Sequence, residues 1–325
     1  GVATNTASIV IFLRLGVKDS ISVCFFLLSC SDLGGLLFVV PAIVFSSYVP
    51  TYPAESWWVD TSSVGLILIF YYLILFDTSQ LITTFIAVQR CCCVVMPFTF
   101  KNTFTRSRAL VTAAFIFAYC VATYTPLLAH QGLRPVFDAA TNSTVLTFWA
   151  SEDRQGYMSL VDKMSGMCLT TICQATIILC LLILAGSLRT SSRFRKSMTS
   201  SSSEISERKT FKKVNRVSGT QSAATTKKNR DVTKNVSGSR REIQAVQSAT
   251  FVSVLFVLCN TPKVVLAYAF IVEPELGLYG RYQNIYYVVN ILRNTVEYIN
   301  VSLNILVYLR FNTRYRQSFF SCLYR

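Results

Sequence analysis

Long apolar runs, each about the length of a membrane-spanning helix, follow one another along this sequence. A helix of about 20 apolar residues spans the ~30 Å hydrocarbon core of a bilayer. Only 14% of the residues are charged and 52% are hydrophobic, which gives far less charge than the quarter typical of a soluble domain. The runs therefore predict membrane-spanning helices rather than a water-soluble core. They lie near residues 21–46, 63–88, 109–129, 167–188, 249–272 and 286–309.

A shorter apolar run, Val2 to Leu13, stands at the start of the chain. We expect it to be a first span that begins inside the membrane, with any preceding segment or signal peptide missing. Counted with the six longer runs, it predicts an all-α membrane protein, a seven-transmembrane helix bundle over residues 1–325.

The distribution of positive charge predicts the orientation of this bundle. The formal net charge is +15, and 25 of the 31 Lys and Arg residues fall in four segments that share a side, namely 14–20, 90–108, 189–241 and 310–325. Loops rich in Lys and Arg stay cytoplasmic. We therefore expect a cytoplasmic C-terminus in a multi-pass plasma-membrane protein, with no nucleic-acid partner. The sequon at Asn142 falls on the predicted outer side, where it could be glycosylated.

The eleven cysteines raise the question of a metal or redox site, above all in Gln89-Arg90-Cys91-Cys92-Cys93. Most of the others fall within predicted spans, and Cys322 lies beyond the cytoplasmic edge, where thiols stay reduced. Zinc sites usually combine cysteine with histidine at short spacings, and the chain has one histidine, His130. We interpret the cysteines as small packing residues, and we expect no zinc site.

Two cytoplasmic segments differ from the spans in composition. Residues 189–241 are basic and rich in serine, which predicts a disordered third cytoplasmic loop. Basic residues before serines, as in Arg195-Lys196-Ser197, suggest kinase sites, although such a loop would also adhere to anionic lipid without any switching role. Residues 311–325 alternate Arg with aromatic residues, as in a short amphipathic helix at the interface, where Cys322 is a candidate for palmitoylation.

Ionisable side chains inside predicted spans are costly and usually face the bundle interior. Arg293 and Glu297 are four residues apart on one helix, so they could simply pair with each other. Alternatively they line a cavity between helices, where ligand pockets in bundles commonly lie. The pocket candidates are Tyr72, Asp77, Lys263, Arg293 and Glu297.

Asn5, Asp32, Arg90, Pro262, Asn304 and Tyr308 form a set defined by their order and spacing. This set resembles the motifs of the rhodopsin-like G protein-coupled receptors. The resemblance covers nearly the whole chain, and its departures are similar to those of divergent invertebrate peptide or chemosensory receptors. At the end of the third span Arg90 and Pro97 are kept, while Gln89 stands where the family has an acid. The remaining matches are Asn5, Asp32 within Leu28-Ser29-Cys30-Ser31-Asp32, Phe256, Pro262 after Cys259-Asn260-Thr261, Asn304, Tyr308 and the segment from Tyr315 to Phe319.

The resemblance implies a receptor that passes the binding of an extracellular ligand to a heterotrimeric G protein, with a receptor kinase and arrestin as further partners. It also implies a cytoplasmic latch between Arg90 and Glu242. The set of residues that it implies for coupling and switching is Arg90, Glu242, Pro97, Phe256, Pro262, Asn304 and Tyr308.

The resemblance further implies a sodium ion as an allosteric modulator, with no other cofactor. The oxygen-bearing set would be Asp32, Ser79, Asn300 and Asn304. The alternative is that Asp32 is only hydrogen-bonded, to Asn5 and Asn304. Where the family usually has a cysteine bonded to the second outer loop, this chain has Gly65, so we expect that disulfide to be absent.

Two other functions stay open at this point. A transporter or channel would also be built of apolar helices, although internal repeats typical of transporters are not visible. A divergent receptor that no longer signals would fit the altered residues Gln89, Asn260 and Ile305. No Ser/His/Asp or Cys/His arrangement can be assembled around His130, so we do not expect an enzyme.

Overall fold

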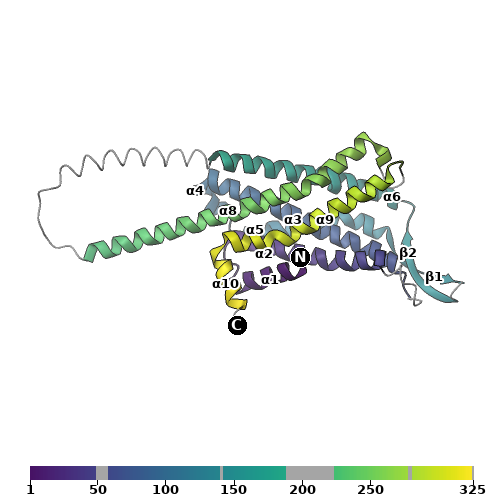
Figure 1. Ribbon diagram of the computed structural model, residues 1–325, viewed down its shortest axis with the longest axis horizontal. Helices are drawn as coiled ribbons and strands as arrows, with labels where there is room; N and C mark the ends of the chain where they lie inside the picture. Colours follow the sequence, from purple (N-terminus) through teal and green to yellow (C-terminus); the bar gives the residue numbers. More distant parts are fainter. Residues whose placement is uncertain (49–57, 140–141, 188–222, 277–279, 324–325) are drawn as a thin grey trace, which may run out of the picture.

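A computed structural model describes residues 1–48, 58–139, 142–187, 223–276 and 280–323. Within them the chain is an elongated bundle of helices with one β-hairpin at an end (Figure 1). The helices and turns are α1 (Val2–Leu15), α2 (Ser20–Ile43), η1 (Val44–Tyr48), α3 (Thr61–Val95), α4 (Pro97–Thr103), α5 (Arg106–Ala129), α6 (Arg154–Val161), η3 (Asp162–Leu169), α8 (Ala223–Val272), η4 (Pro274–Leu276), α9 (Gln283–Phe311) and α10 (Thr313–Leu323).

Five helical stretches in the described part of the chain are long and apolar enough to cross a membrane. A shorter apolar helix, Val2–Leu15, lies at the predicted first span, and α9, with 29 residues, lies at the predicted last one. These five long apolar helices support insertion into a membrane in several passes. These are Ser20–Ser46, Thr61–Val95, Arg106–Ala129, Arg154–Ser187 and Gln247–Val272.

Two segments are more helical than the sequence predicts. The helical stretch Arg154–Ser187 begins well before residue 167 and passes through the π-helical turn η3. Helix α8 begins at Ala223, inside the segment 189–241 that we predict to be disordered; residues 189–222 lie outside the described residues. Residues 223–246 contain one glycine and no proline, so a helix formed by the apolar span can propagate back through them.

The N-terminal ends of α2 and α3 are each set by an aspartate. Asp19 accepts a hydrogen bond from the backbone N–H of Ser22 at 3.1 Å. Asp60 accepts from the backbone N–H groups of Ser62 and Ser63 at 3.3 and 3.0 Å. Such caps satisfy helix donors that have no partner within the helix.

The hairpin consists of β1 (Gln131–Asp138) and β2 (Ser143–Ala150), which pair antiparallel with Gln131 opposite Ala150 and Asp138 opposite Ser143. It lies at the end of the bundle away from α10 (Figure 1). The exposed Asn142 follows the hairpin tip with φ +49°, a left-handed conformation that asparagine tolerates better than most residues. The hairpin was not predicted from the sequence.

The largest buried cluster joins α1, α2, α3, α5, α8, α9 and α10. The ring of Tyr308 lies at its centre, 5.3 Å from Phe12, 5.0 Å from Phe25 and 5.4 Å from Tyr315 between ring centroids. Tyr315 also shares a 2.9 Å hydrogen bond with Ser8. Helix α10 is therefore docked onto the bundle through its aromatic face.

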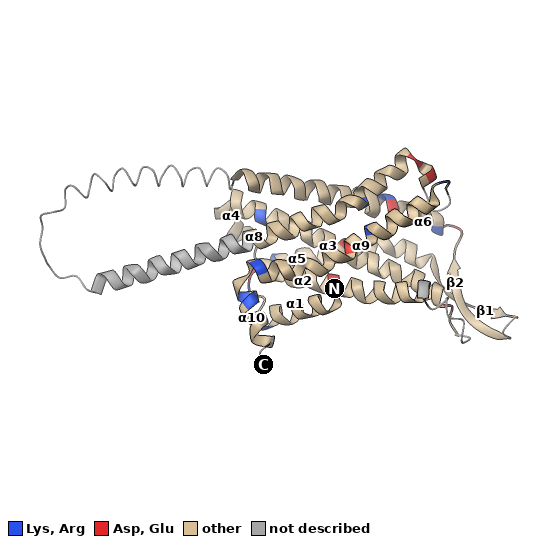
Figure 2. Cartoon of the chain, viewed as in Figure 1, with Lys and Arg blue, Asp and Glu red and all other residues tan. Residues whose placement is uncertain are grey.

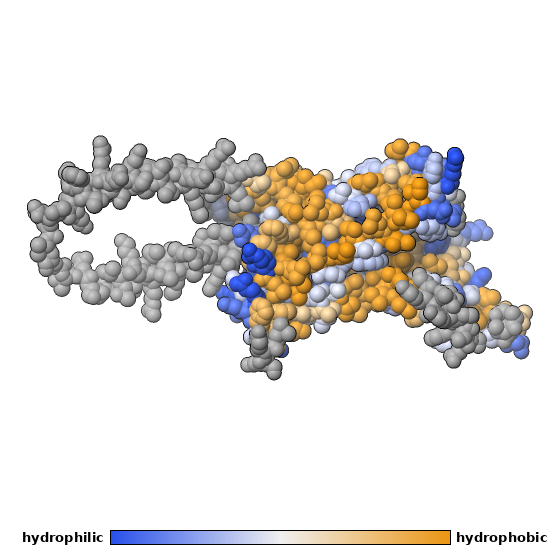
Figure 3. All heavy atoms as spheres, in the orientation of Figure 1, coloured by the Kyte–Doolittle hydropathy of each residue, from blue (hydrophilic) through white to orange (hydrophobic). Residues whose placement is uncertain are grey.

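The outer surface of the bundle is apolar around its middle, as Figure 3 shows. Phe115, Leu182, Val265 and Val288 are among the side chains that are 62% or more exposed. Exposed apolar side chains of this size suit a helix that faces lipid. In Figure 2, Lys and Arg gather around α4 and α10, the end that the sequence predicts to be cytoplasmic.

Candidate functional site

Asp32, in the middle of α2, is 3% exposed and holds two other helices by hydrogen bonds. Ser79 of α3 donates to its Oδ1 at 2.5 Å, and Asn304 of α9 donates to its Oδ2 at 2.9 Å. Asn300 makes no such bond, and Asn5 donates instead to the backbone oxygens of Gly1 and Val301. The structure thus brings together three members of the predicted sodium set and leaves Asn300 apart from their hydrogen bonds.

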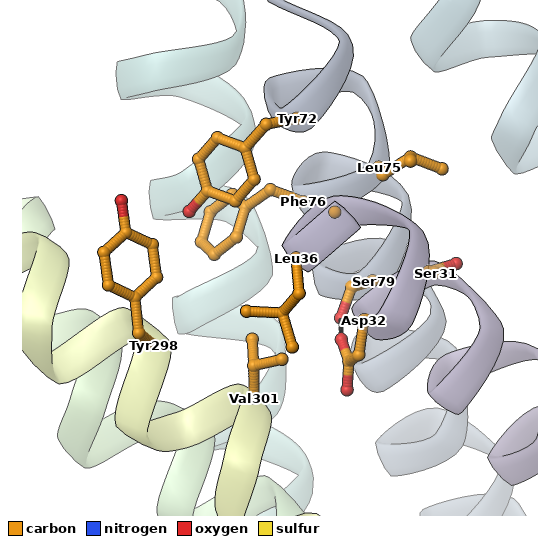
Figure 4. Close-up of a pocket in the computed structure, with 10 residues that line it drawn as sticks. Ser31, Asp32, Leu36, Tyr72, Leu75, Phe76, Ser79, Tyr298 and Val301 are labelled. Atoms are coloured by element: carbon orange, nitrogen blue, oxygen red, sulfur yellow. Dashed lines mark hydrogen bonds between the residues drawn. The ribbon is translucent and has the colours of Figure 1, made fainter. Parts of the chain in front are cut away.

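A small cavity extends from this carboxylate toward the hairpin end of the bundle (Figure 4). Its volume of about 10 Å³ is room for one water molecule or a small ion. Asp32 and Ser79 lie at one end and Tyr72 and Tyr298 at the other. A carboxylate and a hydroxyl oxygen are ligands that suit a hard cation, so the residues present fit a sodium ion. Among the described residues no group of three His, Cys, Asp or Glu side chains could hold a metal ion.

Asp77 faces a different set of helices, although it lies only two residues before Ser79. Its side chain is 2% exposed, and its Oδ2 accepts hydrogen bonds from Tyr124 of α5, at 2.9 Å, and from Ser165 of η3. The hydroxyl oxygens of Tyr124 and Ser165 lie 3.2 Å apart. This carboxylate therefore ties α3 to α5 and to the π-helical turn.

Tyr72, Glu297 and Arg293 meet between α3 and α9. The Tyr72 hydroxyl donates to Glu297 Oε2 over 3.4 Å, and Arg293 Nε lies 3.9 Å from Glu297 Oε1. Glu297 is 5% exposed, and its Oε1 has no hydrogen-bond partner in the described part of the chain. The pairing of Arg293 with Glu297 along one helix is confirmed as an ion pair, but it leaves one buried carboxylate oxygen able to accept another hydrogen bond.

The ammonium group of Lys263, one residue after Pro262 in α8, lies beside the ring of Phe76, next to Tyr72. Its Nζ lies 4.4 Å from the centroid of Phe76, and the Phe76 ring lies 5.8 Å from that of Tyr72. Lys263 is 9% exposed, and its positive charge interacts with the carboxylate of Asp77. Of the five pocket candidates, Tyr72, Arg293 and Glu297 therefore form one contact group, while Lys263 lies between that group and Asp77.

At the other end of α3, Arg90 is 2% exposed, and its Nε and one terminal nitrogen have no hydrogen-bond partner within the described residues. The side chain of Gln89 is bonded elsewhere: it donates to Ser20 at 2.8 Å and accepts from the Cys24 thiol at 3.7 Å. Asp19 is the acid within electrostatic range of Arg90. The side chain of Glu242, the predicted latch partner, lies outside the described residues.

The other predicted switch residues are distributed along the inner half of the bundle. Phe256 packs with Ala87, Ile177 and Cys180, and Pro262 lies within α8. Pro97 is the first residue of α4. Tyr308 is fully buried in the aromatic cluster described above, and no hydrogen bond of its hydroxyl is found among the described residues.

All eleven cysteines lie in the described part of the chain, and none of them is joined in a disulfide. The thiol of Cys322, the predicted palmitoylation site, accepts a hydrogen bond from Arg14 at 2.7 Å. Several residues of the site were not predicted from the sequence. Tyr124 and Tyr298 are polar residues within spans and could have been found by that criterion, but Phe76 and Ser165 carry no such signal.

The family model for the serpentine type 7TM GPCR chemoreceptor Srx matches residues 1–218, two thirds of the chain. A search of curated proteins found no match. The matched region contains Asp32, Ser79 and Arg90.

Proposed function

Because this chain belongs to the Srx family of serpentine type 7TM GPCR chemoreceptors, we propose that it passes the binding of an extracellular chemical ligand to a heterotrimeric G protein. It is a chemosensory receptor of the membrane and not an enzyme. The observation that carries the coupling proposal is the buried Arg90, whose guanidinium keeps two nitrogens without partners at the α10 end of α3. A buried guanidinium whose donors are only partly used, as here beside Cys93 and Asp19, favours a change of state that supplies further partners.

The proposal includes seven spans, with α1 and α9 completing the five long apolar helices. The basic end, with α10, faces the cytoplasm, and the hairpin lies outside with its sequon at Asn142. The proposed location is the plasma membrane, where α10 and a palmitoylated Cys322 would contact lipid. A receptor kinase and arrestin would act on the serine-rich segment 189–241.

The ligand site that we propose lies between α3, α8 and α9, around Tyr72, Lys263 and Glu297. Glu297 Oε1 and the ammonium of Lys263 make no hydrogen bond within the described part of the chain, so both can bind a polar group of a ligand. Each is at least 91% buried, where a charge-assisted hydrogen bond is strong. Asp77, held by Tyr124 and Ser165, serves instead to position α3.

The signal would travel as a shift between two arrangements of the bundle. A ligand can move such an equilibrium only by binding one arrangement better than the other. Asp32 holds α2, α3 and α9 together by hydrogen bonds, and Pro262 interrupts the backbone hydrogen bonding of α8 near Lys263. We propose that the inner half of α8 swings at Pro262 and that a sodium ion beside Asp32 favours the resting arrangement.

A nucleotide-exchange measurement tests this function against a transporter or channel. The full chain, in vesicles with purified heterotrimeric G proteins, is exposed to a panel of small odorant-like molecules and short peptides. We expect at least one ligand to accelerate guanine-nucleotide exchange. Ligand or ion flux across the vesicles without any exchange would support a transporter or channel, and ligand binding with neither would support a receptor that no longer signals.

A further inference from the structure

The hairpin is attached to the first turn of α3 without a covalent bond. Neither β1 nor β2 contains a cysteine, and Gly65 stands at the position on α3 where rhodopsin-like receptors usually have one. A Cβ atom on Gly65 would lie 2.8 Å from the backbone oxygen of Ala42 and 3.0 Å from Cβ of Ser46. The close approach of α2 and η1 therefore leaves no room there for a cysteine side chain.

Backbone hydrogen bonds connect the hairpin to the residues that precede α3. Val59 and Leu146 form a parallel β-bridge. The N–H of Leu146 donates to the oxygen of Trp58 at 3.0 Å, and the N–H of Asp60 donates to the oxygen of Leu146 at 2.8 Å. Strand β2 thus pairs with β1 on one side and with the segment Trp58–Asp60 on the other.

One side chain adds a third hydrogen bond to this attachment. The backbone N–H of Phe148, two residues further along β2, donates to the hydroxyl oxygen of Ser63 at 2.8 Å. Ser63 is 3% exposed, and its hydroxyl donates a hydrogen bond to the carboxylate of Asp60. Asp60 therefore orients the Ser63 hydroxyl so that its lone pairs face the strand.

Arg154, at the start of α6, also attaches the hairpin, at the end where β1 begins. Arg154 Nε donates to Gln131 Oε1 at 2.8 Å. Its guanidinium carbon lies 5.2 Å from the ring centroid of Phe148 and 5.9 Å from that of Phe70 on α3. Phe148 is therefore held from both sides, by Ser63 through its backbone and by Arg154 through its ring.

We propose that Asp60 and Ser63 form a hydrogen-bonded clamp on β2 that takes the place of a disulfide and positions the hairpin at the ligand-entry end of the bundle. Asp60 and Ser63 are positioning residues in this account, because they act on the ligand site through the hairpin. The effect on ligand binding rests on the proposed function, whereas the clamp itself can be tested without a ligand.

Cysteine cross-linking tests the clamp directly. Val59 and Leu146 are bridge partners, and neighbouring strands lie about 4.8 Å apart, within the range that a disulfide spans. We expect the Val59→Cys/Leu146→Cys variant to form a disulfide in intact cells. Its labelling by a membrane-impermeant maleimide should then be at least fivefold lower than that of the control pair. The control pair Val59→Cys/Val136→Cys, which joins no bridge partners, should stay labelled. Equal labelling of the two pairs would overturn the clamp.

The serine is tested in the same background. Ser63→Ala removes the acceptor of the Phe148 N–H and should slow cross-linking about fivefold, the effect of one hydrogen bond. Ser62→Ala is the matched control, because the Ser62 hydroxyl makes no hydrogen bond among the described residues. Equal rates in the two serine variants would remove Ser63 from the clamp.

The positioning role needs an agonist as probe, taken from the exchange screen. At equal surface expression, we expect Ser63→Ala to weaken agonist potency about fivefold and the Val59→Cys/Leu146→Cys disulfide to restore it. A reductant should then abolish the restoration and leave the wild type unaffected. If the cross-link forms but potency is the same in all of these variants, the clamp holds the hairpin without positioning it for ligand, and the proposal fails at that step.

Discussion

Asn304 donates a 2.9 Å hydrogen bond to the carboxylate of Asp32, across 272 positions of the sequence. Ser79 donates to the other oxygen of the same carboxylate at 2.5 Å. Since both donors lie on helices other than α2, one buried side chain determines how three helices approach one another. A ligand or an ion that changes these bonds must also change the packing of the bundle.

The first prediction concerns this carboxylate and sodium. We expect sodium to weaken agonist binding several-fold, because an ion that binds the resting arrangement better shifts the population toward it. Asp32→Asn keeps the shape of the side chain but removes its charge, so agonist affinity in this variant should not depend on sodium. The measurement compares agonist affinity in sodium chloride with that in the chloride of a bulky organic cation. Wild-type binding that is indifferent to this exchange would show that Asp32 is only a hydrogen-bond acceptor.

The second prediction concerns the proposed ligand site. Truncation of one member of a buried charge pair typically costs about 2–5 kcal/mol. Lys263→Ala and Glu297→Ala should therefore each lower agonist potency tenfold or more at unchanged surface expression. Lys163→Ala, which removes an exposed lysine of η3, is the control and should have no effect. Potency that is unchanged in both test variants would assign Lys263 and Glu297 to structural pairing alone.

The third prediction concerns the attachment of α10. Tyr315→Phe removes the hydrogen bond between Tyr315 and Ser8, while Ser8 keeps its hydrogen bond to the backbone oxygen of Thr4. The free energy of unfolding should therefore fall by about 1 kcal/mol. Tyr315→Ala also removes a fully buried ring and should cost about 3–5 kcal/mol. The measurement is thermal unfolding of the solubilised protein. Equal unfolding temperatures for Tyr315→Ala and the wild type would contradict the docking of α10 on α1.

The fourth prediction concerns the resting partner of Arg90. An ion pair to Arg90, which is 2% exposed, should be worth at least the roughly 1 kcal/mol of a surface pair, and that is enough to change a two-state population several-fold. If Glu242 is that partner, Glu242→Ala should raise basal nucleotide exchange several-fold. Asp19→Asn is the informative comparison, because Asp19 is the acid within electrostatic range of Arg90. An increase with Asp19→Asn alone would move the latch from α8 to the start of α2.

The positions of five long apolar helices and the approach of Asp32 to Asn304 could be predicted, because apolar runs and the order of motifs are local features of the sequence. The partners of Asp77 could not be predicted, because Tyr124 and Ser165, which lie 47 and 88 positions away, belong to none of the motifs of the resemblance. The hairpin was missed because Pro135, which cannot donate a ladder hydrogen bond, lies inside one of its strands. The long α8 was missed because polar composition indicates disorder, while helix propagation depends on the adjoining span.

The central claim, that ligand binding at one end of the bundle drives a G protein at the other through Arg90, is tested most directly by one paired measurement. Agonist binding and agonist-driven nucleotide exchange are measured for the wild type and for Arg90→Ala in the same vesicles. We predict that Arg90→Ala binds agonist as the wild type does and produces no agonist-driven exchange. Exchange at the wild-type level in Arg90→Ala would contradict the account.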